Sequence, residues 1–391
     1  MLREVPDIAA TGHRLRSGGQ AVRWLQSRGV VEEWMASGRF GVALRPVELL
    51  VALLAALFGI VPVVLIYLAV IKAVDRYEPE PWWLLLVCFL WGVFGATLFA
   101  LIGNGIGSWV VSDTLAAEAE SQAVIFTTAS FVAPPVEEST KGVALLFVWA
   151  LSALWLKELD GPLDGAIYGG VIGLGFTLTE DVLYVASATL QHGASGGQAV
   201  FILRTIMGGL GHATFTAMTG LGVGIAAEAR SIIIKMLAPV GGWTAAVGLH
   251  FLHNFLVTFL LAGGLGLVLK LLVFWVFDVV FFVLLFVLVM RDRSIVMRGL
   301  ADEVGRMLHP VEFQRTVSYS MVVPFWNTLS LLSSPGGYFA ARRKQLDLVK
   351  LAFVKERIRR GEPEERWAEQ LRHRIDDANR RGVFIGSRQR R

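Results

Sequence analysis

Long apolar runs recur between about residue 47 and residue 290, and they constrain the fold of this chain more than any other feature. A helix that crosses a bilayer needs about 20 consecutive apolar residues, and these runs lie near or above that length. Charged residues make up 17% of the 391 residues, against about 25% in soluble proteins. The sequence therefore predicts an integral membrane protein of the all-α class, a polytopic bundle of transmembrane helices.

The apolar runs divide into seven predicted spans. They lie at about 47–71, 83–110, 136–156, 164–188, 199–228, 236–262 and 266–290. A shorter apolar segment, 123–133, precedes Pro134-Pro135 and is either re-entrant or an extension of the third span as a kinked helix. The predicted count is therefore seven or eight. The two prolines let a new helix begin, which would place Glu137 and Glu138 near the positive end of its dipole.

The spans divide the chain into an N-terminal amphipathic or juxtamembrane segment (1–46), a transmembrane core (47–290) and a basic helical tail (291–391). The core holds sixteen acids against eight Lys and Arg, whereas the tail holds twenty-one Lys and Arg against twelve acids. A basic tail beside a membrane favours anionic lipid as its partner, and no nucleic acid is expected. Cys88 is the only cysteine, which excludes an internal disulfide and a cysteine-based metal cluster.

The charges of the connections predict the orientation of the bundle. Lys and Arg occur in the connections near 72–82, 157–163 and 229–235, whereas the alternating connections contain neither. The positive-inside rule places these three connections and the tail in the cytoplasm. With seven spans, the N-terminus would then lie outside despite its seven arginines, which is a conflict within the sequence itself.

The stretch "APPVEESTKG" at 133–142 places three ionisable groups inside an apolar neighbourhood. A charged side chain at the bilayer centre costs about 2.5–3.5 kcal/mol on insertion scales, so such groups face inward and have partners. Glu137 and Lys141 share a helix face, and Glu138 lies three residues before Lys141. A buried ion pair explains one glutamate but not the second, which is then available to accept a proton.

Other intramembrane polar groups lie on the following spans. Asp164 begins the fourth span and either caps a helix or supports a site, and Glu180 and Tyr184 share a face near the far end of that span. Arg204 and His212 lie on the fifth span. His250 and Asn254, four residues apart on the sixth span, share a face. Glycines at four-residue spacing, Gly169/Gly173 and Gly220/Gly224, predict close helix packing.

This set of side chains suits the hydrolysis of a peptide bond. A carboxylate with a histidine can activate water, and a second histidine with an asparagine can stabilise an oxyanion. Two histidines and a carboxylate could instead hold Zn(II). There is no His-Glu-x-x-His motif, and "GASG" at 193–196 is better explained as a connection than as a serine nucleophile. The alternative function is a proton-coupled transporter that uses the same Glu and His groups.

Five blocks of the sequence resemble the PrsW family of bacterial intramembrane proteases, which is related to the CAAX-prenyl-protease and bacteriocin-processing superfamily. They are "DRYEPEPWWLL", "APPVEESTKG", "DGAIYGGVIGLGFTLTEDVLY", "GHATFTAMTG" and "LHFLHNF", in the order found in the family. They cover roughly residues 75–260. The block that contains Glu180 departs from the family pattern, because Asp181 stands where the family commonly has an asparagine.

The resemblance implies a role for each matching residue. One of Glu137 and Glu138 would be the general base, the other would support it, and Lys141 would tune the pair. His212 would complete water activation or ligate a metal. His250 and Asn254 would orient the substrate, stabilise the oxyanion or ligate a metal, and both glutamates are possible ligands. Asp164, Glu180, Tyr184 and Arg204 are candidates for support.

The resemblance also implies a biological setting. It predicts a multi-pass protein of a bacterial-type plasma membrane that cleaves a single-span membrane protein. Site-1 cleavage of an anti-sigma factor is the activity associated with the family. Members are often labelled metalloproteases, but related enzymes are argued to work without metal. The expected cofactor is therefore either none or Zn(II).

Overall fold

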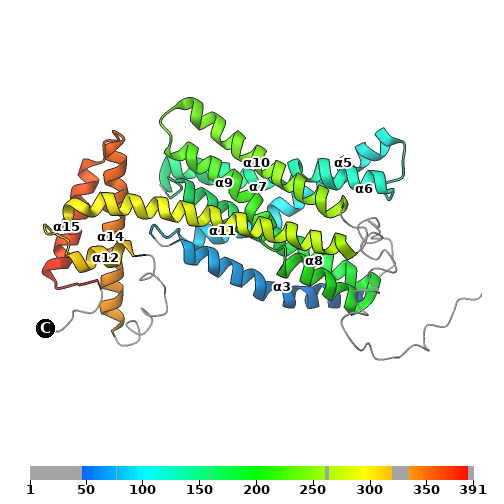
Figure 1. The fold of residues 1–391 in the computed structure, drawn as a ribbon, viewed down its shortest axis with the longest axis horizontal. Helices are drawn as coiled ribbons and strands as arrows, with labels where there is room; N and C mark the ends of the chain where they lie inside the picture. Colours follow the sequence, from blue (N-terminus) through cyan, green and yellow to red (C-terminus); the bar gives the residue numbers. More distant parts are fainter. Residues whose placement is uncertain (1–45, 76, 157, 260–263, 319–333, 386–391) are drawn as a thin grey trace, which may run out of the picture.

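The computed structural model describes residues 46–385, except 76, 157, 260–263 and 319–333. The amphipathic segment predicted at 1–46 therefore lies outside the described residues except for Pro46. Within the described residues the chain is helical and forms no strand, which confirms the predicted all-α class (Figure 1).

The helices follow the apolar runs of the sequence. The transmembrane part contains α3 (Pro46–Val74), α4 (Trp82–Leu90), α5 (Thr97–Leu115), α6 (Gln122–Thr127), α7 (Ala133–Leu151), α8 (Pro162–Val200), α9 (Gly211–Glu228), α10 (Ile232–Phe259) and α11 (Gly264–Leu300). Short π-helical segments join several of them: η2 (Trp91–Ala96), η3 (Thr128–Val132), η4 (Ser152–Leu156) and η5 (Phe201–Ile206). The tail contains η6 (Ala301–Glu303), α12 (Pro310–Val317), α14 (Pro335–Arg359) and α15 (Glu365–Arg380).

Five helical stretches among the described residues are long and apolar enough to cross a membrane. They are Pro46–Val74, Trp82–Leu115, Gln122–Leu156, Pro162–Glu228 and Ile232–Val257. The fourth stretch is 67 residues long. It folds back on itself, so that α8 and α9 pack side by side (Figure 1). It therefore contains both the predicted fourth and fifth spans. The count of seven or eight spans stays a prediction.

The segment predicted as either re-entrant or kinked is the start of one long helical stretch. Gln122–Leu156 runs through α6, η3, α7 and η4 without leaving helical geometry. Pro134 and Pro135 lie in the first turn of α7, where the π-helical turn before them accommodates the missing N–H groups. The expectation that Glu137 and Glu138 follow a free helix start is therefore wrong, since both lie near the middle of a continuous stretch.

Close packing of α8 against α9 depends on glycine, as the sequence predicted. A Cβ atom on Gly165 would lie 2.0 Å from the carbonyl oxygen of Gly220, and one on Gly169 would lie 2.4 Å from that of Thr216. A Cβ on Gly173 would lie 2.3 Å from the carbonyl oxygen of His212. Only glycine lets the two backbones approach this closely, and this approach brings α9 against the middle of α8.

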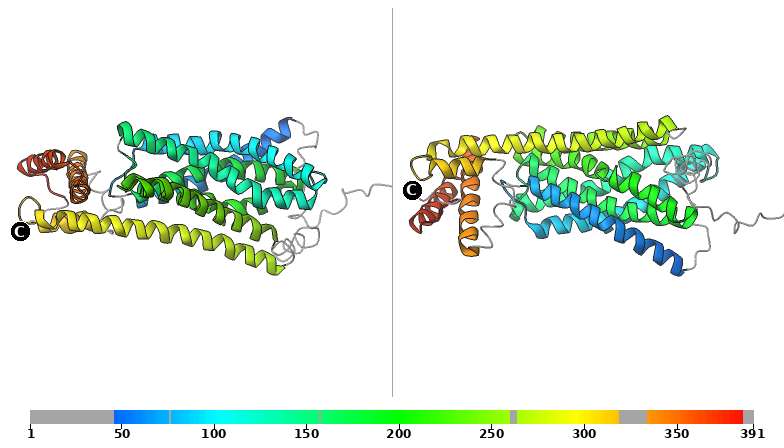
Figure 2. Two further views of the ribbon diagram at one scale, coloured as in Figure 1. Left: turned by 90° about the horizontal axis from the view of Figure 1, so that it is seen from above. Right: turned by 60° about the horizontal axis from the view of Figure 1, so that its bottom comes forward.

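The tail packs against one end of the bundle, where α3, α7 and α9 end and where α4, α8 and α10 begin (Figures 1 and 2). α11 continues through residue 290 into the tail without a break. Arg357 Nη1 binds Asp160 at 2.6 Å, Arg360 pairs with Glu228, and Tyr77 donates to the carbonyl of Val317 at 3.2 Å. The predicted cytoplasmic connections and the tail therefore lie together.

Candidate functional site

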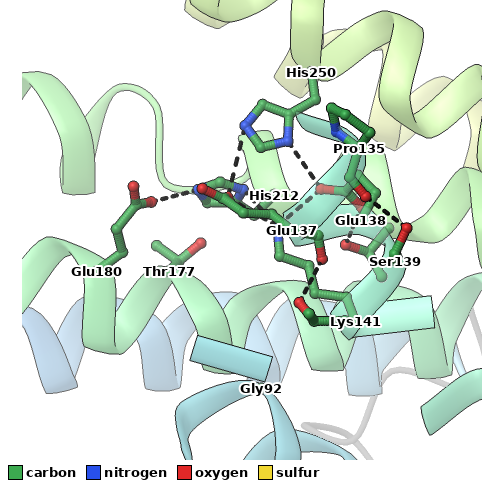
Figure 3. Close-up of polar contacts among 12 residues, drawn as sticks. Gly92, Pro135, Glu137, Glu138, Ser139, Lys141, Thr177, Glu180, His212 and His250 are labelled. Carbon is green, nitrogen blue, oxygen red and sulfur yellow. Dashed lines mark hydrogen bonds and ion pairs between the residues drawn. The ribbon is translucent and has the colours of Figure 1, made fainter. Parts of the chain in front are cut away.

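Four helices bring ionisable side chains to one level of the bundle. Glu137, Glu180, His212 and His250 lie between sixteen and nineteen residues from the ends of their helical stretches beside the tail. At 1.5 Å per residue that is about 24–29 Å along each helix. Figure 3 shows their side chains pointing toward one another. The antiparallel arrangement therefore assembles one site from distant parts of the sequence.

A buried lysine lies between the two glutamates of α7. Glu137 is 5% exposed, and Glu138 and Lys141 are fully buried. Lys141 Nζ is 2.8 Å from Glu138 Oε1 and 3.6 Å from Glu137 Oε2 (Figure 3). The lysine thus forms a hydrogen-bonded ion pair with Glu138 and only a longer electrostatic contact with Glu137.

The surroundings of the two carboxylates differ in a way that separates their roles. Glu138 Oε1 also binds His250 Nδ1 at 3.0 Å, and Glu138 Oε2 accepts a hydrogen bond from Thr216 at 2.9 Å. Glu137 Oε1 accepts a bond from Asn104 Nδ2 at 3.0 Å, but its Oε2 is buried without a hydrogen-bond partner. Glu138 therefore uses both oxygens to hold the site together, whereas Glu137 has one oxygen available.

His212 lies between a cation and a carboxylate. Its Nδ1 is 3.0 Å from Lys141 Nζ, and its Nε2 is 2.6 Å from Glu180 Oε2. An ammonium group only donates hydrogen bonds and a carboxylate only accepts them. These two partners assign a neutral imidazole that accepts at Nδ1 and carries its proton on Nε2. The lone pair of Nδ1 therefore points toward α7.

A break in the helix before α9 places His212 at this level. η5 ends at Ile206 and α9 begins at Gly211, and non-helical backbone inside a bundle needs other hydrogen-bond partners. Tyr67 on α3 donates to the carbonyl groups of Thr205 at 3.2 Å and Ile206 at 3.0 Å. The side chain of this tyrosine thus satisfies carbonyl groups freed by the break.

Glu180 is held by its own ion-pair network. Arg204 Nη2 is 2.8 Å from Glu180 Oε2, and Arg204 Nε is 2.9 Å from Asp181 Oδ1. The guanidinium also lies 4.0 Å from the ring centre of Tyr184. Thr205 donates to Asp181 at 2.8 Å. Asp181 therefore anchors the arginine that orients Glu180, and through it His212.

His250 faces the same centre from α10. Its Nδ1 bonds to Glu138, so the proton lies on Nδ1, and its Nε2 is 3.9 Å from Glu137 Oε2. The ring stacks on Phe215 with centroids 4.9 Å apart and planes 18° apart. The rings of His250 and His212 are 5.0 Å apart. The Nε2 lone pair of His250 therefore faces Glu137, whereas the Nδ1 lone pair of His212 faces Lys141.

Asn254 uses its amide on the backbone of the bulge before α7. In η3, Ala133 N–H donates to the carbonyl of Thr128, five residues back. The next carbonyl in this register, that of Ala129, would need an N–H from Pro134, which has none. Asn254 Nδ2 donates to Ala129 O at 2.9 Å and supplies the missing donor. In this structure Asn254 therefore holds the bulge that precedes the two glutamates.

Asp164 lies outside this site. Its Oδ2 accepts hydrogen bonds from the backbone N–H groups of Gly161 at 2.7 Å and Asp160 at 3.2 Å. It therefore caps the start of α8, the simpler of the two alternatives that the sequence allowed.

Sequence reasoning missed Asn104, Thr216 and Tyr67. A polar residue inside an apolar span was the signal for Asn104, and the four-residue spacing from His212 was the signal for Thr216.

The group formed by Glu137, His212 and His250 also fits a metal ion. One ligand atom from each lies within 4.8 Å of the other two, and two histidines with a carboxylate are a ligand set of catalytic zinc sites. Each histidine donates its other ring N–H to a carboxylate, Glu138 or Glu180, which is the usual support for a zinc-binding histidine. Glu138 is not part of this group.

Comparison with known proteins places this site in a family. A model described as PrsW family intramembrane metalloprotease matches residues 80–289, more than half of the chain. The chain belongs to the PrsW family. The resemblance stated from the sequence is therefore confirmed, and the protein is a multi-pass membrane protease. Family membership does not favour the alternative of a transporter.

The match to the PrsW family includes the glutamates, the histidines and Asn104, whereas Tyr67 precedes it. The searches of curated proteins and of solved structures found no match.

Proposed function

We propose that this protein is an intramembrane endopeptidase that hydrolyses a peptide bond of a single-span membrane protein. The observation that carries the proposal is the Glu137 carboxylate. Its Oε1 is held by Asn104, and its Oε2 is buried without a hydrogen-bond partner beside Lys141 and His250. A carboxylate arranged in this way is suited to accept a proton from water inside a membrane.

In the proposed reaction, Glu137 Oε2 accepts a proton from water while the water oxygen bonds to the carbonyl carbon of the substrate. The proton then passes to the leaving nitrogen as the C–N bond breaks. The products are a carboxylic acid and an amine, and Glu137 is regenerated. The Lys141 ammonium, 3.6 Å from Oε2, stabilises the negative charge that develops on the carbonyl oxygen of the substrate.

The same atoms also provide a second version of the chemistry. Glu137 Oε2, His212 Nδ1 and His250 Nε2 would hold Zn(II), and zinc would supply the Lewis acidity that activates water and polarises a carbonyl group. His212 Nδ1 would then exchange its bond to Lys141 for the metal. The lysine would keep its ion pair with Glu138 at 2.8 Å. In this version Glu137 is a ligand, and in the metal-free version it is the base.

The setting that we propose follows the family. The protein would lie in a bacterial plasma membrane with its C-terminus in the cytoplasm, and its basic tail would contact anionic lipid. The position of the tail supports a cytoplasmic C-terminus. Arg230, in one of the basic connections that the positive-inside rule assigns to the cytoplasm, donates to the carbonyl of Arg360 in the tail. A membrane-spanning anti-sigma factor is the proposed substrate.

Proteolysis by the purified full-length protein tests this proposal. The protein in lipid nanodiscs is incubated with a panel of labelled single-span membrane proteins that includes anti-sigma factors, and fragments are identified by mass spectrometry. We expect cleavage by the wild type and at least a 100-fold slower rate for Glu137→Gln. Glu48→Gln, a carboxylate at the start of α3, is the control and should cleave normally. A Glu137→Gln variant as fast as the wild type would refute the assignment.

Metal analysis separates the two versions of the chemistry. The zinc-bound version predicts about one zinc per active protein, loss of this zinc in His212→Ala and His250→Ala, and inhibition by a chelator. An active preparation that contains no zinc and resists the chelator would establish the metal-free version, with Glu137 as the base.

A further inference from the structure

A residue on α5 holds the proposed base in position. Asn104 Nδ2 is 3.0 Å from Glu137 Oε1, and it is the one hydrogen-bond donor to this carboxylate within the described part of the chain. We propose that Asn104 is a positioning residue of the hydrolytic reaction. It orients Glu137 so that Oε2, and not Oε1, faces His250 and Lys141. This inference rests on the proposed function.

The local sequence explains how α5 reaches the site. In "IGNGIG", Gly103 lies one residue before Asn104 and faces Val136 of α7, and Gly107 lies three residues after it and faces Val132 of η3. A Cβ atom on Gly103 would lie 2.6 Å from Val136 Cγ1, and one on Gly107 would lie 2.3 Å from Val132 Cγ1. The two glycines therefore let α5 approach α7 closely, and this approach brings the amide of Asn104 within hydrogen-bond distance of Glu137.

The two oxygens of Glu137 are not equivalent in this arrangement. Oε1 is occupied by Asn104, while Oε2 lies 3.6 Å from Lys141 Nζ and 3.9 Å from His250 Nε2. These two distances are beyond hydrogen-bond range, so neither contact by itself prevents rotation of the carboxylate. The Asn104 bond does. Without the Asn104 bond, the carboxylate is free to rotate toward Lys141. Oε2, the oxygen that the reaction needs, would then be bonded to the lysine.

The amide is also better suited to this place than a carboxylate. Only the nitrogen of an asparagine side chain donates hydrogen bonds, and Asn104 Oδ1 is buried without a partner of its own. The orientation of the amide is thus determined by Glu137. An aspartate of the same shape would replace the donor by an oxygen and place two carboxylates about 3 Å apart, where like charges repel.

The test compares isosteric variants of Asn104 in the full-length protein. Asn104→Asp and Asn104→Leu are measured with a substrate protein that the wild type cleaves, and Ser108→Ala, one turn further along α5, is the matched control. We expect kcat to fall about 10- to 100-fold, as for other residues that orient a reactive group. KM should stay within about twofold. Unchanged kcat in both variants, or a loss confined to KM, would overturn the inference.

A second measurement does not depend on proteolysis. Asn104→Leu, Glu137→Leu and the double variant are compared by thermal unfolding. Each single change leaves a buried polar group without its partner, whereas the double change removes both. The double variant should therefore melt above the temperature that the two single decreases predict together. Additive decreases would overturn the Asn104–Glu137 contact. A wild type that cleaves no membrane protein would count against the proposed function and leave this comparison valid.

Discussion

The pairing of Lys141 with Glu138, and not with Glu137, predicts a specific pattern of stability in combined variants. Lys141→Met removes an ammonium that is fully buried, 2.8 Å from Glu138 and 3.6 Å from Glu137. Removing one partner of a buried ion pair costs about 3–5 kcal/mol, because the remaining charge is uncompensated. At about 2–4 °C per kcal/mol, the melting temperature should fall on the order of 10 °C.

A second substitution then shows which glutamate is left uncompensated. Glu138→Gln in the Lys141→Met background should recover most of the loss, since it removes the charge in direct contact with the lysine. Glu137→Gln should recover less, because Asn104 still holds that side chain. Intrinsic fluorescence of the 12 tryptophans follows unfolding in detergent, with Lys235→Met as the control. Equal or better recovery by Glu137→Gln would refute the reasoning, as would a decrease below about 2 °C for Lys141→Met.

Two further predictions concern the surroundings of the site, and a third concerns the connection between α3 and α4 beside the tail. Tyr67→Phe removes the donor to the helix break before His212, and proteolysis should slow several-fold; an unchanged rate would contradict this role. Gly173→Ala places a methyl group 2.3 Å from the carbonyl of His212 and should reduce proteolysis at least tenfold, whereas Gly105→Ala, which meets no atom within 4 Å, should not. Burial, aided by neighbouring acids, raises the pKa of Glu78 from 4.5 to about 8. The stability that its neutral form provides is present below pH 4.5 and is lost as pH rises to 8, so Glu78→Gln should flatten the fall in melting temperature between pH 5 and 8.

Much of the fold was predictable because the constraint that produces it is local. A bilayer requires long apolar helices with every backbone group paired. The apolar runs of the sequence therefore predicted where the helices lie. The same constraint pointed to the site, since an ionisable side chain inside such a run is costly unless it faces inward with a partner. Glu137, Glu180, His212 and His250 were recognisable for this reason before any tertiary contact was known.

Some expectations failed where the helix itself is irregular. Pro134-Pro135 suggested a helix start, but the π-helical turn η3 carries the helix through these residues with the help of Asn254. The continuity of the helix at these prolines depends on a hydrogen-bond donor from α10, about 120 residues away. The helix propensity of the local sequence does not indicate that donor. The break before His212 depends in the same way on Tyr67 of α3.

The sequence by itself determined the membrane class, the helical spans and the inward-facing set of carboxylates and histidines, because these follow from the free-energy cost of polar groups in lipid. Only the tertiary structure decided how they are paired. Glu137 and Glu138 are adjacent and chemically identical, yet one has both oxygens engaged by α9, α10 and Lys141, and the other has one oxygen available. That difference arises from the rotation and distance of neighbouring helices, down to the two glycines that let α5 bring Asn104 to Glu137.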